Sequence, residues 1–189
     1  MSAGRSERLR ELVPVAVHLD RPWRVVIAGV PNVGKSSLVN ALAGFARSIV
    51  SPTAGTTRDV VTTRTALDGW PIELCDTAGQ RTSTHTVESA GIERARAAAA
   101  AADCLVWVLD GSTTFVEPGR ADLVVVNKVD LPAAWHVGAA MLPVSAATGH
   151  GLDVLTRAIV DHLVPHPPEA GEAVPVTSGA RARLESFES

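Results

Sequence analysis

The chain has 189 residues, enough for one globular domain with modest tails. Its formal net charge of −3 argues against a protein that lives mainly on nucleic acid or anionic lipid, because such proteins carry an excess of Lys and Arg. The two cysteines are too few for a disulfide framework, and no apolar stretch is long enough to cross a membrane, so we expect a cytoplasmic protein.

The first third of the chain predicts the start of an α/β nucleotide-binding fold. Residues 5–13 predict a short helix inside a lead-in of residues 1–21. Residues 23–28 are nearly all apolar and rich in β-branched side chains, which is typical of a parallel strand buried on both faces. A glycine-rich turn follows, and residues 36–43 predict a helix that ends at Gly44.

The remaining elements continue the alternation of strands and helices. Two strands, 59–67 and 71–76, flank the hairpin signal Asp68-Gly69. Further elements are predicted as a long helix over 87–102, buried strands over 104–110 and 122–127, a short strand over 142–145, and a closing helix over 152–163. The Pro-, Ala-, Glu- and Ser-rich residues 165–189 predict a mostly disordered tail, which leaves residues 22–164 as the main domain.

The turn after the first strand matches the phosphate-binding pattern G-x-x-x-x-G-K-[ST] from Gly29 to Ser36. Its glycines let backbone N–H groups curl around phosphate oxygens, and the following helix adds the positive end of its dipole. Lys35 supplies a cation for the β- and γ-phosphates, and the Ser36 hydroxyl can bind Mg²⁺. The residues predicted to bind nucleotide here are Asn32, Val33, Gly34, Lys35, Ser36 and Ser37.

A second motif, Asn127-Lys128-Val129-Asp130, follows a predicted buried strand and selects the base. Guanine presents two adjacent donors, N1–H and the N2 amino group, which the Asp130 carboxylate can accept together. Adenine presents an acceptor in the same place, and such an unmet buried charge costs on the order of 1–3 kcal/mol. Lys128 can lay its stem along the base, and Asn127 can tie the loop together.

Three shorter motifs complete the set. Asp76-Thr77-Ala78-Gly79 follows a strand, so Asp76 can hold Mg²⁺ through water and Gly79 can present its N–H to the γ-phosphate. Thr57 can close the Mg²⁺ shell only when the γ-phosphate is present, which makes its loop a switch. Ser145-Ala146-Ala147 can offer an N–H to guanine O6. Together the motifs predict a protein that binds GTP with Mg²⁺ and hydrolyses it to GDP.

These motifs resemble those of P-loop GTPases, and most closely those of the G domain of the MnmE (TrmE) family of tRNA-modification GTPases. Residues 31–42, 54–59 and 76–94 carry the resemblance, which covers roughly residues 23–163. Era and Der proteins share much of it, but Val87-Glu88 with Gly91-Ile92-Glu93-Arg94 points to the MnmE family. The resemblance implies a three-layer P-loop NTPase fold of the small-GTPase type, with a mostly parallel central sheet.

The resemblance also implies a mechanism. Asn32 would help to coordinate a K⁺ ion against the phosphates, and two G domains would meet across their switch faces. Glu88 would orient the attacking water through a second water. The family usually carries an apolar residue where this chain has Gln80, and an amide there can orient the water directly. The candidate catalytic residues are therefore Lys35, Glu88 and Gln80. For orienting the water we favour Glu88 over Gln80, because Glu88 is the residue that the family resemblance implies.

Two further departures bear on function. The link from Asp110 to Asp122 is too short for the helix normally found there, so we expect a loop or turn in a thinner flank of the sheet. The folate-binding and helical domains of full MnmE proteins, and their C-terminal cysteine motif, have no counterpart in the sequence. We therefore expect a stand-alone relative or a truncated copy that does not modify tRNA uridine by itself.

A second functional class stays open beside the hydrolase. It is a nucleotide-gated binding module similar to Era and Der, associated with the ribosome or RNA and hydrolysing GTP weakly. The partners expected from the sequence are GTP and GDP, a second copy of the chain through the switch face, and a tRNA-modification or ribosome partner, with no membrane.

Overall fold

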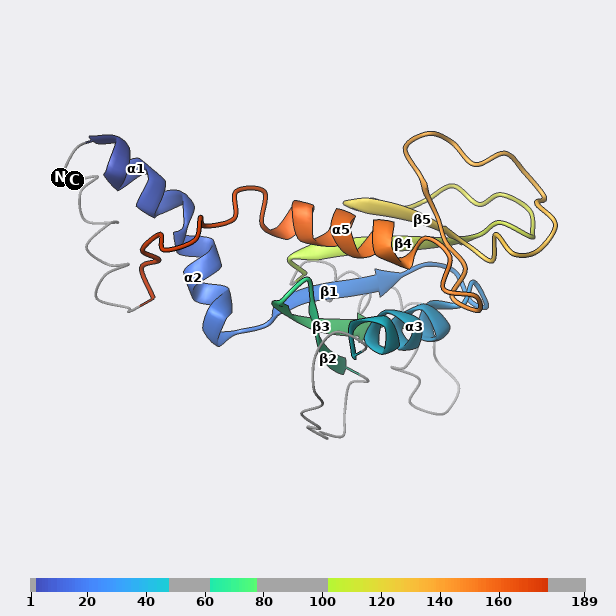
Figure 1. Ribbon diagram of the computed structural model, residues 1–189. Coiled ribbons are helices and arrows are strands. Elements are labelled where there is room, and N and C mark those ends of the chain that lie inside the picture. The colour runs from blue at the N-terminus through green and yellow to red at the C-terminus, as the bar shows by residue number, and fades with distance from the viewer. Residues whose placement is uncertain (1–2, 48–61, 78–101, 177–189) are drawn as a thin grey trace, which may run out of the picture. The chain divides into compact units, whose positions relative to one another are not determined.

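The computed structural model of the chain describes residues 3–47, 62–77 and 102–176. The chain divides into two compact units, one of residues 23–163 and one of residues 1–22 and 164–189. Within its described residues, the larger unit contains the strands β1 (Trp23–Ala28), β2 (Thr62–Leu67), β3 (Trp70–Asp76), β4 (Cys104–Asp110), β5 (Leu123–Asn127) and β6 (Leu142–Pro143), and the helices α3 (Lys35–Arg47) and α5 (Leu152–Leu163) (Figure 1).

The six strands form one sheet in the order β2-β3-β1-β4-β5-β6. Only β2 runs antiparallel to its neighbour, and the other pairs are parallel. The carboxyl ends of β1, β3, β4 and β5 therefore lie along one edge of the sheet. In open α/β sheets the ligand binds at this edge, beside the strand from which the strand order continues in opposite directions. In this sheet that strand is β1, which lies between β3 and β4. The predicted α/β fold with a mostly parallel sheet is confirmed.

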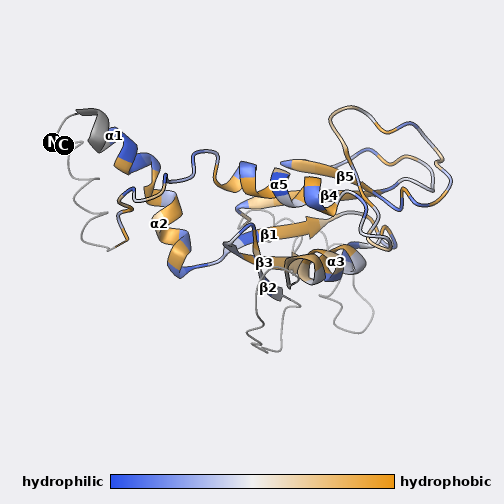
Figure 2. Cartoon of the chain, viewed as in Figure 1, coloured by the Kyte–Doolittle hydropathy of each residue, from blue (hydrophilic) through white to orange (hydrophobic). Residues whose placement is uncertain are grey.

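Strand β1 is buried on both faces, because Val25, Val26 and Ile27 are all inaccessible to solvent. Figure 2 accordingly colours β1 and β5 mostly as hydrophobic, whereas α5 shows bands of both kinds. Helices α3 and α5 contact each other and lie on the same face of the sheet (Figure 1). Apolar side chains at helical spacing anchor α5 to this face, and they are Leu152, Leu155, Ile159 and Leu163.

The hairpin predicted at Asp68-Gly69 is present between β2 and β3. Asp68 has φ 47° and Gly69 has φ 86°, the two positive angles that a type I′ turn requires. Residues 87–101 of the predicted long helix, and residues 59–61 of the predicted first hairpin strand, lie outside the described residues.

The prediction that the helix after β1 ends at Gly44 is wrong, because α3 continues to Arg47. Its buried positions Leu38, Leu42 and Ala46 follow one another at intervals of four residues, so the apolar face extends past the glycine. Packing of that face outweighs the weak helix propensity of one glycine.

Gly44→Ala is expected to raise the free energy of unfolding by about 0.5–1 kcal/mol, because alanine restricts the unfolded chain and suits a helix. A Cβ atom at Gly44 would meet nothing within 4 Å. Urea denaturation measures the change. Gly69→Ala is the matched control: a Cβ there also meets nothing, but the residue has φ 86° and alanine is strained in that region. A loss of stability in the Gly44 variant would contradict the prediction.

The link between β4 and β5 contains no helix, as predicted for its length. Residues 128–141 between β5 and β6 contain none either, so α5 is the only helix in the fully described stretch 102–176. The link is tied down at its end, where Asp122 and Leu105 exchange two hydrogen bonds through the Leu105 backbone. Gly119 of this link lies against the Trp107 ring, because a Cβ atom added at Gly119 would be 2.8 Å from the nearest ring atom.

The smaller unit contains α1 (Ala3–Glu11) and α2 (Val13–Asp20), where one helix over residues 5–13 was predicted. Pro14 does not interrupt a helix, because it lies in the first turn of α2, where its missing N–H has no partner to lose. The Arg8 guanidinium donates to both carboxylate oxygens of Glu172, at 2.8 and 3.0 Å, and to the Pro167 carbonyl at 3.1 Å.

These contacts raise the pKa of Arg8 and lower the pKa of Glu172. They join residues of the predicted lead-in and of the predicted tail within one unit. Residues 177–189 of that tail lie outside the described residues, and the division at residues 21 and 164 stays a prediction. Within the described ranges, no helix combines the length and the apolar character needed to span a bilayer.

Candidate functional site

The glycine-rich loop of residues 29–34 connects β1 to α3 at the ligand edge of the sheet. It begins at Gly29, whose backbone lies tightly against β4: a Cβ at Gly29 would lie 2.4 Å from the Val108 carbonyl oxygen, and Gly29 has φ 143°. Only glycine allows the chain to leave the sheet here, so the loop curls back tightly before α3 begins at Lys35. The N-terminus of α3 therefore faces into this loop, which is called the phosphate loop below.

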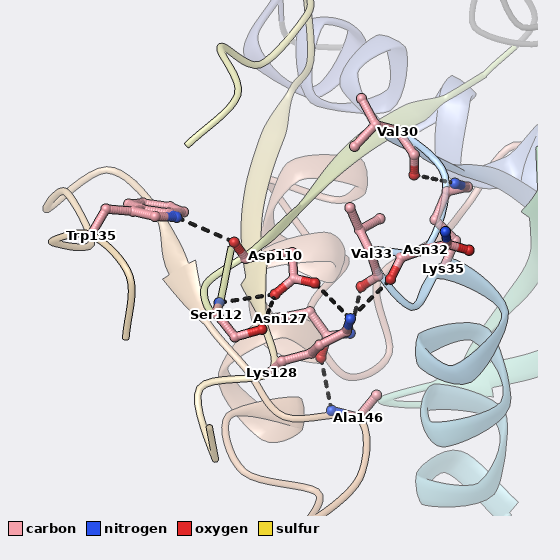
Figure 3. Close-up of polar contacts among 10 residues, drawn as sticks. All are labelled: Val30, Asn32, Val33, Lys35, Asp110, Ser112, Asn127, Lys128, Trp135 and Ala146. Carbon is pink, nitrogen blue, oxygen red and sulfur yellow. Dashed lines mark hydrogen bonds and ion pairs between the residues drawn. The ribbon is translucent and has the colours of Figure 1, made fainter. Parts of the chain in front are cut away.

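Lys35 places its ammonium inside the phosphate loop. The residue is only 6% exposed, and its Nζ donates to the Gly29 carbonyl oxygen at 2.9 Å. It also donates to the Val30 carbonyl oxygen at 2.8 Å, the contact that Figure 3 shows. A buried ammonium is stable only with such acceptors. Phosphate oxygens are stronger acceptors than carbonyls, because both partners then carry charge. The loop thus presents a cation and a helix N-terminus to the same place, which suits a phosphate group.

Ser36 and Asp76 meet beside the phosphate loop. The Ser36 hydroxyl, in the first turn of α3, donates to the Asp76 carboxylate at the end of β3. Thr77 fixes the turn that follows, because its hydroxyl and its N–H both donate to the Ile27 carbonyl, at 3.1 and 3.3 Å. A hydroxyl and a carboxylate side by side are the hard oxygen donors that Mg²⁺ prefers, so these residues fit a magnesium ion.

Asn127 joins three loops through one buried side chain. The residue is 2% exposed; its Nδ2 donates to the Val33 carbonyl at 2.9 Å, and its Oδ1 accepts from the Ala146 N–H at 3.0 Å (Figure 3). The end of β5, the phosphate loop and the turn after β6 are thereby held in fixed relative positions.

Lys128 crosses the phosphate loop from the other side. Its Nζ donates to the Asn32 carbonyl at 2.9 Å and to the Asp110 carboxylate at 2.6 Å. Its Cε lies 3.9 Å from an added Cβ at Gly34, so the stem runs along the loop. The backbone of Lys128 is left-handed, with φ 66°, which costs on the order of 1 kcal/mol and persists only where the surroundings hold it.

Asp110 is a residue of this site that sequence analysis missed. Its carboxylate, at the end of β4, also accepts from the Ser112 N–H at 2.9 Å and the Ser112 hydroxyl at 2.6 Å. Burial alone would raise its pKa, but the hydrogen bonds from Lys128 and Ser112 outweigh burial and lower the pKa, so the group is ionised. Its position was a usable signal, since an acid that ends a central strand lies at the ligand edge.

The turn of residues 145–147 lies beside Asn127. Ser145 is fully buried; its N–H donates to the His150 carbonyl at 2.9 Å, and its hydroxyl accepts from the Thr148 N–H at 3.1 Å. Ala147 and Asp130 are exposed, on loops that leave the same edge of the sheet.

The predicted site residues thus divide into three groups. Asp130, Ser145 and Ala147 lie on loops that leave the same edge of the sheet. The structure brings together Asn32, Val33, Gly34, Lys35, Ser36, Asp76, Asn127, Lys128 and Ala146, with the exposed Ser37 in the first turn of α3. Thr57, Gly79, Gln80 and Glu88 lie outside the described residues.

A second cluster of polar side chains lies at the opposite edge of the sheet. Ligand atoms of Cys104, Asp122 and His162 lie within 4.8 Å of one another, although their spacing in the sequence gave no sign of it. Burial, with the nearby carboxylates of Asp122 and Asp103, raises the pKa of the Cys104 thiol to about 12. The thiol is therefore protonated at neutral pH, and the cluster is separate from the phosphate loop.

Residues 24–133 match the protein family described as "50S ribosome-binding GTPase". The chain belongs to this GTPase family. It is 41% identical over 169 residues to the tRNA modification GTPase MnmE of Thermus thermophilus, a match that covers 87% of this chain and 38% of the relative. It is 45% identical over 157 residues to the MnmE of Chloroflexus aurantiacus, covering 75% of this chain and 35% of the relative. The chain therefore spans little more than a third of these curated relatives.

Among solved structures, the G domain of the T. maritima FeoB iron transporter is similar, with a TM-score of 0.53 and 24% identity over 75% of this chain and 99% of that one. This similarity supports the fold alone. The comparisons confirm the predicted resemblance to MnmE-type G domains and the prediction of a GTPase that binds and hydrolyses GTP.

Proposed function

We propose that the edge formed by the phosphate loop, Asp76 and the loop of residues 127–130 binds GTP and hydrolyses it by a K⁺-stimulated mechanism that is faster in a dimer. The nucleotide assignment rests on two hydrogen bonds between the phosphate loop and the loop of residues 127–130, which is named the base loop. They run from Asn127 to Val33 and from Lys128 to Asn32. These two hydrogen bonds hold residues 29–34 and 127–130 together at one edge, which supports a site where a phosphate cradle and a base-reading loop act on one nucleotide.

Each residue of the edge has a distinct role in this proposal. Lys35 and the N-terminus of α3 hold the β- and γ-phosphates, and Asp130 accepts the two guanine donors. Ser36, with Asp76 through water and Thr57, would hold the Mg²⁺ ion, which when bound offsets the negative charge of the phosphates. The turn of residues 145–147 meets guanine O6 with a backbone N–H.

Hydrolysis needs an oriented water, and Glu88 or Gln80 is proposed to orient it. Asn32 is exposed and left-handed, with φ 68°, and Lys128 holds its carbonyl. We propose that the side-chain amide oxygen of this exposed residue helps to hold a K⁺ ion beside the phosphates. The MnmE relatives motivate a cytoplasmic setting and partners from tRNA modification or the ribosome.

Turnover of GTP is expected to be faster in K⁺ than in Na⁺ by about 100-fold, because one electrostatic contact to the transition state contributes 10²–10³ in rate. The rate per molecule is also expected to rise with protein concentration. Phosphate release measured in each salt across a range of protein concentrations tests both points. Asn32→Ala should remove the difference between salts, whereas Asn40→Ala, an exposed position of α3, should leave it. Equal rates in the two salts would reject the K⁺ proposal.

A nucleotide-gated binding module that hydrolyses GTP only weakly is the second candidate. The observation that favours it is the pair of helix-free loops, 111–122 and 128–141, which expose the apolar side chains of Phe115, Val116 and Leu131. Single-turnover kinetics separate the two functions: conversion of bound GTP within minutes supports the hydrolase, and bound GTP that stays intact supports the binding module.

A further inference from the structure

Asp110 stands where the nucleotide edge meets the two helix-free loops. Its carboxylate binds Lys128 and Ser112, and its carbonyl accepts from the Trp135 indole N–H at 3.2 Å (Figure 3). The next residue, Gly111, donates its N–H to the Asn127 carbonyl and accepts from the Ala134 N–H, both at 2.9 Å. One residue of β4 thus contacts the base loop directly and anchors both flanking loops.

The contact between Asp110 and Lys128 fixes a side chain that is otherwise flexible. Lysine has four rotatable bonds and loses much entropy when it is held in one position. The Asn32 carbonyl offers it one neutral acceptor, whereas Asp110 offers a full charge at 2.6 Å. The Asp110 side chain is 9% exposed and the Lys128 side chain 32%, so solvent and salt screen this pair less than a surface ion pair.

The contacts of the carboxylate separate its two oxygens by task. Oδ1 accepts both hydrogen bonds from Ser112, which close the turn after β4, and among the residues that the structure describes Oδ2 accepts from Lys128 alone. The Oδ1 contacts shape the local turn, and an amide oxygen can replace them. The Oδ2 contact reaches across to the phosphate loop, and an amide group that points its NH₂ at the lysine cannot replace it.

We propose that Asp110 is a positioning residue for the guanine nucleotide: it holds Lys128 across the phosphate loop, and this contact sets how fast the nucleotide leaves. The inference rests on the proposed nucleotide site, because it requires the base to lie beside the lysine stem. Asp110 itself does not touch the nucleotide. The Trp135 contact places the loop of residues 128–141 against the same residue, so displacement of that loop would act on nucleotide release through Asp110.

The test measures release of GDP that carries a fluorescent N-methylanthraniloyl group, after excess GDP is added. Asp110→Asn is expected to speed release about 10- to 100-fold, the factor that corresponds to losing one hydrogen bond between charged groups. Asp110→Glu should restore part of the slow release. Ser112→Ala removes the hydrogen bond from the Ser112 hydroxyl to Oδ1 and keeps the one from its backbone N–H. It should therefore change the rate of release less than Asp110→Asn does.

Two readouts distinguish positioning from a merely structural role. In the background of Lys128→Met, Asp110→Asn should have no further effect, because the contact it acts through is already absent. Asp110→Asn should also leave the preference for GDP over xanthosine diphosphate unchanged, since the residue does not read the base.

Each opposite result overturns the inference. The first such result is release at the wild-type rate in Asp110→Asn. The second is that Asp110→Asn speeds release equally in the wild-type and Lys128→Met backgrounds, and the third is a shift of preference toward xanthosine diphosphate. Absence of any GDP binding by the wild-type chain would instead reject the proposed function. Thermal unfolding of each variant confirms that it is folded before release is measured, and Asp110→Glu carries the test if Asp110→Asn does not fold.

Discussion

Asp130→Asn is expected to weaken GDP binding by on the order of 100-fold and to make xanthosine diphosphate the preferred ligand. The carboxylate of Asp130 accepts two guanine donors, and each hydrogen bond to a charged group is worth about 1.5–3 kcal/mol. Xanthine carries a carbonyl in place of the guanine amino group. An asparagine amide can donate to that carbonyl, whereas it places its own donor against one of the guanine donors.

The structure gives Asp130 a fixed backbone and an open side chain. Its neighbours are held on both sides, because the Val129 N–H donates to the Val144 carbonyl at 3.2 Å and the Leu131 N–H to the Lys128 carbonyl at 3.0 Å. The side chain itself is exposed at the ligand edge. Replacing its carboxylate by an amide therefore changes the ligand without disturbing the loop, so a change in base preference is the expected signature rather than a loss of stability.

Calorimetric titration with the two diphosphates measures the switch, with Asp68→Asn as the matched control. Asp68 is also an exposed acid, and asparagine suits its left-handed φ of 47° in the β2–β3 turn. The control should bind GDP as the wild type does. Unchanged GDP affinity in Asp130→Asn would show that the base-reading loop is misassigned.

The sequence predicted the elements whose signals are local. The continuous apolar runs of β1 and β4 and the helical spacing of α5 gave these three elements their bounds, since burial on both faces or on one stripe leaves a direct mark on residue order. Asp68-Gly69 gave the hairpin because few residues accept two positive φ angles. Gly44 misled the prediction, because its effect on helix length depends on whether the following residues find a surface to cover.

The residues of the site also divide into those with a local sequence signal, which were predicted, and those that depend on distant contacts, which were not. The phosphate loop and the 127–130 motif were predicted because their function imposes residue types at fixed spacing. The role of Asp110 depends on Lys128, 18 positions later, and on a strand order that brings the ends of β4 and β5 together. The contact of Asn127 with Val33 spans 94 positions. Such pairings become visible only once the sheet is assembled, and no local pattern encodes them.

Asn127→Ala is expected to lower the free energy of unfolding by roughly 2–4 kcal/mol and to abolish tight GDP binding. The substitution leaves the buried Val33 carbonyl and the half-buried Ala146 N–H without their partner, and an unmet buried group costs about 1–3 kcal/mol. It also unties the phosphate loop from the base loop, so a nucleotide would have to order both loops on binding. Urea denaturation and calorimetry with GDP measure the two effects, with Asn40→Ala, an exposed amide on α3, as control.

Asn127→Asp tests whether the hydrogen bond to the Val33 carbonyl, rather than the volume of the side chain, holds the two loops together. A carboxylate can still accept from the Ala146 N–H, but it faces the Val33 carbonyl with a second acceptor where the amide donated. If the donated bond holds the two loops together, the aspartate variant binds GDP no better than the alanine variant, even at low temperature where both are folded. Tight GDP binding by a folded Asn127→Asp variant would mean that the two loops hold their positions without this bond, and Lys128 would then be their main connection.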